Sequence, residues 1–212
     1  MPKNVEKMTT NYSPNFNLRK RSIKVIKYII FHYTGMKSDR SAISKLTDFN
    51  SKVSCHYYIG KNGNLIQMVP DLYVAWHAGK SYWKKDKLLN DSSIGIEISN
   101  PGHLHGYIAF NKKQIKCLIK ISKKLIKKYR IKKQNILGHS DIAPLRKKDP
   151  GEKFPWKFLA NKKIGVWHNL NYKRCNKLRG KQNNIENKFF FKKLKKIGYF
   201  VNTSKKNELK KI

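Results

Sequence analysis

The chain has 212 residues, of which 39 % are hydrophobic, and its formal net charge is +36 from 48 Lys and Arg against 12 Asp and Glu. This length suits one full domain with an appendage, and three scattered cysteines without a C-x-x-C pair exclude a disulfide framework and a thiolate zinc site. No apolar run reaches the length of a membrane span, and the first 20 residues lack the apolar core of a signal peptide. The sequence as given therefore predicts a cytoplasmic protein. An export signal outside this sequence would instead indicate the periplasm or envelope.

The first half of the chain predicts an arm, a strand, a helix and a hairpin, in that order. Residues 1–21 show no hydrophobic period and are expected to form an irregular arm. Residues 22–31 are rich in isoleucine and aromatic side chains, which is typical of a buried strand. Residues 39–49 carry apolar side chains at helical spacing. Residues 55–69 predict a β-hairpin, because Asn62-Gly63 supplies the positive φ angles of a tight turn.

The second half predicts a loop, two strands and the clearest helix of the chain. Residues 80–92 are polar and aromatic and are expected to form a surface loop. Residues 94–99 form a strand pattern in which Glu97 lies among isoleucines. Residues 111–130 place isoleucine and leucine on one helical face and lysines on the other, and residues 135–137 form a last short strand.

Beyond Trp156 the composition changes. Residues 161–184 are rich in Lys and Asn with little periodicity, so we expect a linker. Residues 185–212 contain one weak amphipathic helix that ends at Gly198.

The positive charge has two interpretations. It is compatible with an anionic partner such as nucleic acid, a membrane surface or an acidic wall polymer. The lysines are spread along the whole chain, however, and no stretch interleaves basic residues with stacking aromatics. This distribution favours compositional drift, and we expect no specific nucleic-acid partner.

The loop from Gly138 to Gly151 holds the most reactive combination of residues. His139 and Asp149 lie ten positions apart in it, and both are good zinc ligands. His32 ends the first predicted strand, so neighbouring strands would bring both imidazoles to one edge of a sheet. A lone histidine beside a strand, such as His56, is more often a hydrogen-bonded core residue. Two histidines and one carboxylate leave an open fourth position on a tetrahedral zinc, which is typical of a catalytic site.

Three further residues have competing interpretations. Asp141 could replace Asp149 as a ligand, although its position in a tight turn favours bracing of the loop. Glu97 on an apolar strand would have a raised pKa and could act as a general base, or it could pair with one of the many lysines. Lys147, between His139 and Asp149, could stabilise an oxyanion, as could its neighbour Arg146; otherwise Lys147 is one solvated lysine among many.

Five segments together resemble the type 2 N-acetylmuramoyl-L-alanine amidases, over roughly residues 22–160. These segments are Phe31-His32-Tyr33-Thr34, Ser54-Cys55-His56-Tyr57, Trp76-His77-Ala78-Gly79, Ser93-Ile94-Gly95-Ile96-Glu97, and Gly138-His139-Ser140-Asp141 continuing through Lys147-Lys148-Asp149-Pro150-Gly151 to Phe154-Pro155-Trp156. The likeness is greatest to the bacterial branch that works in cell-wall turnover and recycling.

The resemblance implies an α/β fold, with a central mixed β-sheet flanked by helices and one zinc ion at an edge of the sheet. It implies hydrolysis of the amide between the lactyl group of N-acetylmuramic acid and L-alanine, in peptidoglycan or soluble muropeptides. His32, His139 and Asp149 match the zinc ligands, Glu97 the catalytic carboxylate and Lys147 the catalytic lysine. His77 and Asn90 lie in segments similar to the substrate groove.

Other implications concern the remaining segments and the partners. Some relatives have a tyrosine near the metal where this chain has Cys55, so this chain would depend on Glu97. Residues 185–212 resemble the start of a helical peptidoglycan-binding module but are too short to complete it. We expect a monomer whose partner is the wall substrate. The alternative function is a peptidoglycan-binding protein of the same fold without catalysis.

Overall fold

The computed structural model describes residues 8–171, 173, 176 and 187–201. Its strands are β1 (Thr9–Thr10), β2 (Phe16–Asn17), β3 (Tyr28–Tyr33), β4 (Tyr57–Ile59), β5 (Leu65–Gln67), β6 (Val74–Ala75), β7 (Tyr82–Trp83), β8 (Asp86–Lys87), β9 (Ser93–Ile98) and β10 (Ile136–Gly138). Its α-helices are α1 (Asp39–Thr47), α2 (Lys112–Tyr129), α3 (His139–Ile142), α4 (Trp156–Asn161) and α6 (Asn187–Ile197).

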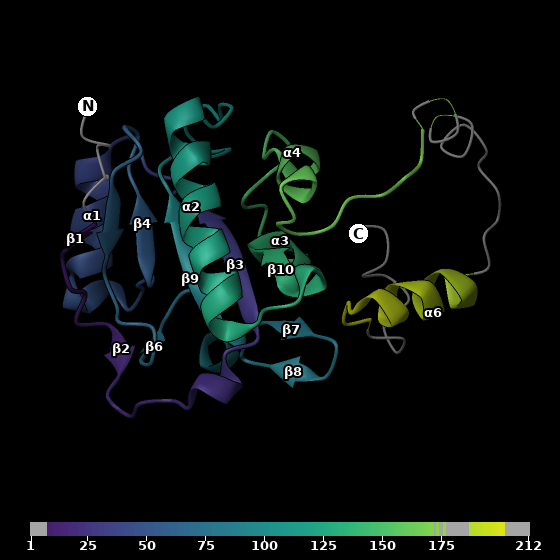
Figure 1. Cartoon of the computed structure of the whole chain (residues 1–212), viewed down its shortest axis with the longest axis horizontal. Helices are drawn as coiled ribbons and strands as arrows, with labels where there is room; N and C mark the ends of the chain where they lie inside the picture. The colour runs from purple at the N-terminus through teal and green to yellow at the C-terminus, as the bar shows by residue number, and fades with distance from the viewer. Residues whose placement is uncertain (1–7, 172, 174–175, 177–186, 202–212) are drawn as a thin grey trace.

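A six-stranded mixed sheet forms the centre of the molecule, with strand order β1-β5-β4-β9-β3-β10 (Figure 1). Strands β4, β9, β3 and β10 are parallel to one another, and β5 runs antiparallel to β4 through the hairpin around Gly63, whose φ is 82°. Helices α1 and α2 flank this sheet, whereas α6 lies apart from it (Figure 1). The expected α/β class with a central mixed sheet is therefore confirmed.

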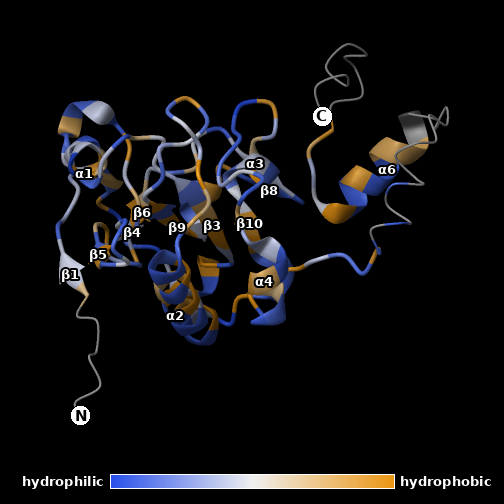
Figure 2. Ribbon diagram, turned by 90° about the horizontal axis from the view of Figure 1, so that it is seen from above, coloured by the Kyte–Doolittle hydropathy of each residue, from blue (hydrophilic) through white to orange (hydrophobic). Residues whose placement is uncertain are grey.

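Helix α2 covers one face of the sheet because its apolar side chains recur at helical spacing. Its residues Ile115, Leu118 and Leu125 are buried against the isoleucines of β9, and its lysines face outward (Figure 2). Asn111 begins the helix by accepting a hydrogen bond from the backbone N–H of Gln114, whose side chain caps in return. The helix predicted over residues 111–130 is confirmed.

The opposite face of the sheet carries shorter elements. Because side chains alternate along a strand, Ile29 and Phe31 of β3 pack under α2, whereas Tyr28 and Ile30 lie in a second cluster with Ala78, Trp83, Leu89, Leu137 and Ile142. Helix α1 packs near the other end of this face, over a third cluster that contains Leu46, Cys55, Tyr58 and Met68. The sheet is thus covered on both faces.

Several segments differ from the sequence-based expectation. Residues 8–21 are not an irregular arm throughout, since β1 pairs with β5 and β2 pairs with β6. Strand β3 begins at Tyr28, because residues 23–25 form a short 3-10 turn. Residues 80–92 contain the β7–β8 hairpin and bury Trp83 and Leu89, so this stretch is more than a surface loop. Ile164 is fully buried in the main core, which carries the compact domain past residue 160.

The C-terminal helix occurs where the sequence predicts it and ends beside the β7–β8 hairpin. After α6, the Gly198 carbonyl accepts a hydrogen bond from Lys84 N–H, and the Tyr199 ring packs edge-on against Trp83. The Tyr199 hydroxyl donates to the Asp141 carboxylate at 2.8 Å. A segment far along the chain therefore contacts α3. Of the linker expected over residues 161–184, residues 161–171, 173 and 176 are described, and the rest lies outside the described ranges.

Tyr199→Phe is expected to lower the free energy of unfolding by about 1 kcal/mol, because the half-buried Asp141 carboxylate loses a donor. Urea denaturation measures the difference. Tyr12→Phe, at a tyrosine that is 58 % exposed, is the matched control and should stay within about 0.5 kcal/mol of the parent. Equal stability of the two variants would show that the contact contributes nothing.

Among the described helices, none combines the length and hydropathy that crossing a lipid bilayer requires.

Candidate active site

Parallel pairing of β3 with β9 places His32 beside Glu97. The two residues are direct partners in the register, so their side chains emerge on the same face of the sheet. That face is the one opposite α2, since the neighbouring Phe31 and Ile96 point into the α2 core. Both residues lie near the carboxyl ends of their strands, where sites in sheets of this kind are commonly built.

The turn after β10 brings His139 to the same place. Strand β10 pairs with β3, and α3 begins at His139 directly after Gly138. Asp141 accepts a hydrogen bond from Gly138 N–H at 2.8 Å, so it braces this turn, as the sequence indicates.

The loop then folds back until Ser140 N–H donates to the Asp149 carbonyl at 2.8 Å. Gly138 permits the return, because a Cβ at this position would lie 2.6 Å from Pro150 Cδ.

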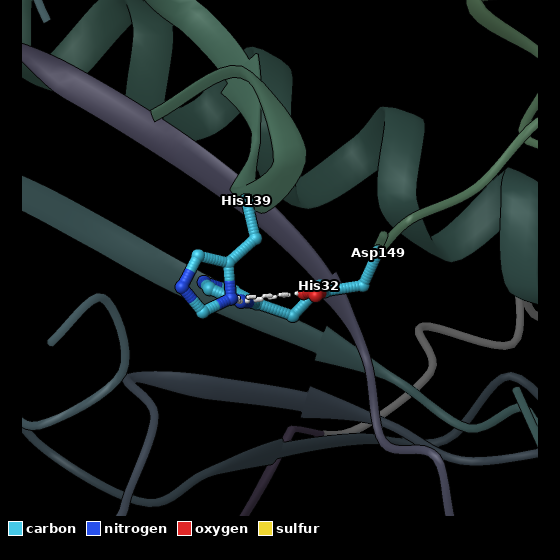
Figure 3. A group of neighbouring side chains, drawn as sticks. All are labelled: His32, His139 and Asp149. Atoms are coloured by element: carbon cyan, nitrogen blue, oxygen red, sulfur yellow. Dashed lines mark hydrogen bonds and ion pairs between the residues drawn. The ribbon is translucent and has the colours of Figure 1, made fainter. Parts of the chain in front are cut away.

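Three potential metal-binding atoms converge at this point (Figure 3). His32 Nδ1 lies 2.9 Å from His139 Nδ1 and 3.1 Å from Asp149 Oδ2, and His139 Nδ1 lies 3.0 Å from the same oxygen. All three residues are buried. Two zinc ligands at about 2.0 Å from a tetrahedral ion lie about 3.3 Å apart. The three atoms therefore need to separate by only a few tenths of an ångström to hold a zinc ion.

The electron pairs at this point also favour a cation. His139 Nε2 donates to the Ala78 carbonyl at 3.1 Å, so a neutral His139 presents a lone pair at Nδ1. Burial, together with the nearby His139, lowers the pKa of His32 to about 4, which favours the neutral form of His32. Asp149 adds a carboxylate oxygen at the same point, within 3.1 Å of both Nδ1 atoms. Three basic atoms thus share one point, which fits a divalent cation with an open fourth position.

Arg146 supports this site by binding the backbone beside it. Its Nη2 atom donates to the carbonyls of Ala78 and Lys80, each at 2.7 Å. Both hydrogens of that nitrogen are engaged, so it cannot also donate to the nearby His139 Nε2. Arg146 therefore fixes the loop that carries the Ala78 carbonyl, and the structure does not aim it at a reacting oxygen.

Glu97 lies partly buried at the wall of a cleft of about 460 Å³. Its Oε2 atom is buried and has no hydrogen-bond partner among the described residues. Burial raises the pKa of Glu97 to about 8, the charge of Asp149 adds to the rise, and Lys147 opposes it. Lys147 lines the same cleft and is near enough to act electrostatically on both Glu97 and His32.

Of the two residues expected in the substrate groove, His77 borders the cleft, and both make hydrogen bonds within the protein. His77 is buried, with its ring nitrogens 3.0 Å from His32 Nε2 and 3.1 Å from Ser93 Oγ. Asn90 Oδ1 accepts hydrogen bonds from the backbone N–H groups of His77 and Ala78. These contacts favour positioning roles, and substrate contact by either side chain stays a prediction.

The sequence analysis did not predict the other residues that line the cleft. Its wall includes the aromatic and apolar side chains Tyr33, Met36, Trp76, His103 and Leu104, with Lys45 and Lys148 as further cations. Tyr33 ends β3 and Lys45 lies on α1, whereas the others come from loops after β3, β6, β9 and α3, and no spacing in the sequence links them. Cys55 packs in the core against Met68.

The metal-free protein should lose stability as pH rises, because the folded pKa of Glu97, about 8, exceeds its unfolded value of 4.5. The folded state then favours the protonated carboxyl, so the loss runs from about pH 4.5 to pH 8. One pKa unit is about 1.4 kcal/mol, and solvent in the cleft reduces the effect, so we expect a loss of about 2–3 kcal/mol. Urea unfolding at pH 5 and pH 8, compared with Glu97→Gln, measures it. Parallel pH dependence of the two proteins would contradict the shift.

Comparison with known proteins gives consistent matches. The N-acetylmuramoyl-L-alanine amidase family (Amidase_2) matches residues 22–152. The N-acetylmuramoyl-L-alanine amidase AmiD of Escherichia coli is 42 % identical over 154 residues, which are 67 % of this chain and 55 % of that protein. The 1,6-anhydro-N-acetylmuramyl-L-alanine amidase AmpD of the same organism is 40 % identical over 105 residues, or 50 % of this chain and 55 % of AmpD. The chain thus spans about half the length of these curated relatives.

A solved structure of E. coli AmiD in complex with the substrate anhydro-N-acetylmuramic acid-L-Ala-D-γ-Glu-L-Lys superposes with a TM-score of 0.73 at 36 % identity. The match covers 88 % of this chain and 77 % of the AmiD chain. The family match extends over more than half of the sequence and contains Glu97 and all three converging residues. From fold, site and similarity together, this chain belongs to the N-acetylmuramoyl-L-alanine amidase family.

Proposed function

We propose that the protein is a zinc-dependent amidase that hydrolyses the bond between the lactyl group of N-acetylmuramic acid and L-alanine. The observation that carries this proposal is that His32 Nδ1, His139 Nδ1 and Asp149 Oδ2 meet near a buried carboxyl oxygen of Glu97 that has no hydrogen-bond partner in the described part of the chain. A zinc ion held by the three atoms would supply Lewis acidity and a water of lowered pKa.

Glu97 is the group that moves the proton. Its carboxylate accepts a proton from the water that attacks the lactyl carbonyl carbon. When the C–N bond breaks, Glu97 passes this proton to the leaving nitrogen of L-alanine. The products are a lactyl carboxylate and a peptide with a free amino terminus. A pKa raised by burial suits this work, because the carboxyl must both take and return a proton near neutral pH.

Lys147 supports the same reaction by its charge. It lines the cleft beside Glu97 and Asp149, and its ammonium group would stabilise the negative charge that develops on the carbonyl oxygen. His139 and its carbonyl partner Ala78 keep one wall of the site fixed while this charge develops.

The substrate class follows from the relatives. The AmiD complex contains an anhydromuramyl tripeptide, and AmpD is named for the 1,6-anhydro sugar. We propose muropeptides, including the anhydro form, as substrates of this chain. The cationic residues Lys45, Lys147 and Lys148 at the cleft complement the carboxylates of a stem peptide.

The experiment is incubation of the zinc-loaded protein with an anhydromuramyl tripeptide and, in parallel, with the corresponding non-anhydro muropeptide. Mass spectrometry should show one added water and a peptide that begins with L-alanine. Chelator should stop the cleavage, and added zinc should restore it. Binding of either probe without cleavage, with one zinc per chain, would instead support the non-catalytic peptidoglycan-binding alternative. Cleavage at a different bond would reject the assigned reaction.

A further inference from the structure

His32 is joined to a chain of buried groups on the side of its ring away from Asp149. His32 Nε2 lies 3.0 Å from His77 Nδ1, and His77 Nε2 lies 3.1 Å from Ser93 Oγ. The Ser93 hydroxyl in turn contacts the carbonyl oxygen of Leu89. All of these residues are buried, so water cannot readily substitute for any link.

The direction of each hydrogen bond follows from the carbonyl at the far end. A carbonyl only accepts, so the single hydrogen of the Ser93 hydroxyl points to Leu89. Ser93 Oγ must then accept from His77 Nε2–H, which leaves a lone pair at His77 Nδ1. That lone pair accepts from His32 Nε2–H.

We propose that His77 and Ser93 are positioning residues that set the tautomer of His32, so that its Nδ1 atom presents a bare lone pair at the metal point. The inference rests on the zinc site of the proposed function and assigns to His77 a role other than substrate contact. Outer hydrogen bonds of this kind orient ligand histidines and raise their basicity.

The tautomer of His32 needs to be set because the other tautomer, with hydrogen on Nδ1, is also accessible. Without metal, a hydrogen on His32 Nδ1 would point at the Asp149 carboxylate 3.1 Å away, a favourable charge-assisted hydrogen bond. Zinc would then have to displace that hydrogen. The carbonyl of Leu89, acting through Ser93 and His77, opposes this by requiring the hydrogen of His32 at Nε2.

The surroundings hold His77 in place for this task. The His77 ring lies directly over Gly95 of β9, where a Cβ would come within 2.4 Å of His77 Cγ. Asn90 Oδ1 holds the backbone here by accepting hydrogen bonds from the N–H groups of both His77 and Ala78. The ring therefore occupies a space that β9 leaves open only because residue 95 is glycine.

Ser93→Ala is the deciding variant, with Ser122→Ala as its matched control. Both serines are fully buried, but Ser122 lies on α2, across the sheet from the site. Nitrogen-15 NMR of the metal-free proteins reports which nitrogen of His32 carries hydrogen. We expect the Nε2–H form in the parent and in Ser122→Ala, and a substantial Nδ1–H population in Ser93→Ala.

Zinc affinity, measured by competition with a chromophoric chelator, gives a second readout. Ser93→Ala should weaken zinc binding about 10-fold, and His77→Phe should weaken it by up to about 100-fold, while Ser122→Ala should match the parent. The proposal is overturned if Ser93→Ala leaves both the His32 tautomer and the zinc affinity at the values of the parent, whatever His77→Phe does. Failure of the parent itself to bind zinc would reject the proposed function instead, and the NMR result does not depend on zinc.

Discussion

Glu97→Gln is expected to lower kcat by about 10²–10⁴-fold while one zinc ion stays bound per chain. The amide keeps the size of the side chain but cannot accept a proton from water or return one to the leaving nitrogen. Glu97 is not one of the three residues whose ligand atoms converge, so the Glu97→Gln protein should still bind zinc. Turnover of the anhydromuramyl tripeptide and zinc content, measured on the same preparation, test both parts.

Glu152→Gln controls for the loss of one negative charge. Glu152 is an exposed glutamate whose carboxylate contacts His103 Nε2 at 2.9 Å. This variant should keep kcat within a few-fold of the parent. A Glu97→Gln protein with parental turnover would remove Glu97 from the mechanism, and the proton would then need another acceptor in the cleft.

Asp149→Asn is expected to weaken zinc binding by more than about 100-fold and to reduce turnover in proportion to the lost zinc. The change removes the only anionic member of the converging set, and outer hydrogen-bonding partners alone account for 10–100-fold in such sites. Chelator competition measures the affinity, and activity at increasing zinc concentration should recover in part.

Asp86→Asn is the control for the second experiment, since Asp86 binds Tyr28 and Lys27 at the β7–β8 hairpin, apart from the three converging atoms. It should bind zinc as the parent does. Parental zinc affinity in Asp149→Asn would contradict the assignment of Asp149 and would draw attention to Asp141, the other carboxylate of the loop.

The two histidines could be predicted because each stands at the end of a strong local pattern, whereas Asp149 was indicated by its place in the Pro- and Gly-containing loop and by the resemblance to amidases. His32 and His139 follow short apolar runs, and parallel neighbours bring their carboxyl ends together. Glu97 stood out as an acid among isoleucines, and the register places it beside His32. The resemblance to amidases added Lys147, and its place in the cleft agrees with that role.

The supporting contacts could not be predicted, because they depend on how loops pack. The segment around His77 lies over β9 only in the folded chain, so its link to Ser93 has no signature in spacing. The sequence allows Arg146 to stabilise an oxyanion, but in the structure its Nη2 atom donates both hydrogens to backbone carbonyls. The contact of Tyr199 with Asp141 spans 58 positions of sequence.

Local propensity also failed where tertiary pairing decides the structure. Residues 9–10 and 16–17 become strands because β5 and β6 offer free edges, although their own sequence has no strand period. The beginning of a peptidoglycan-binding module at residues 185–212 stays a prediction, and residues 202–212 lie outside the described ranges. The expected monomer and the absence of a specific nucleic-acid partner also stay predictions.

The most direct measurement is a zinc titration of the metal-free protein, followed by the rate of anhydromuramyl tripeptide cleavage. Turnover should rise linearly with added zinc and reach a plateau at one equivalent, since one set of three ligands serves one active site. The plateau should be absent in Asp149→Asn at the same zinc concentrations. Turnover that is independent of zinc, or that keeps rising well beyond one equivalent, would contradict a single catalytic zinc at His32, His139 and Asp149.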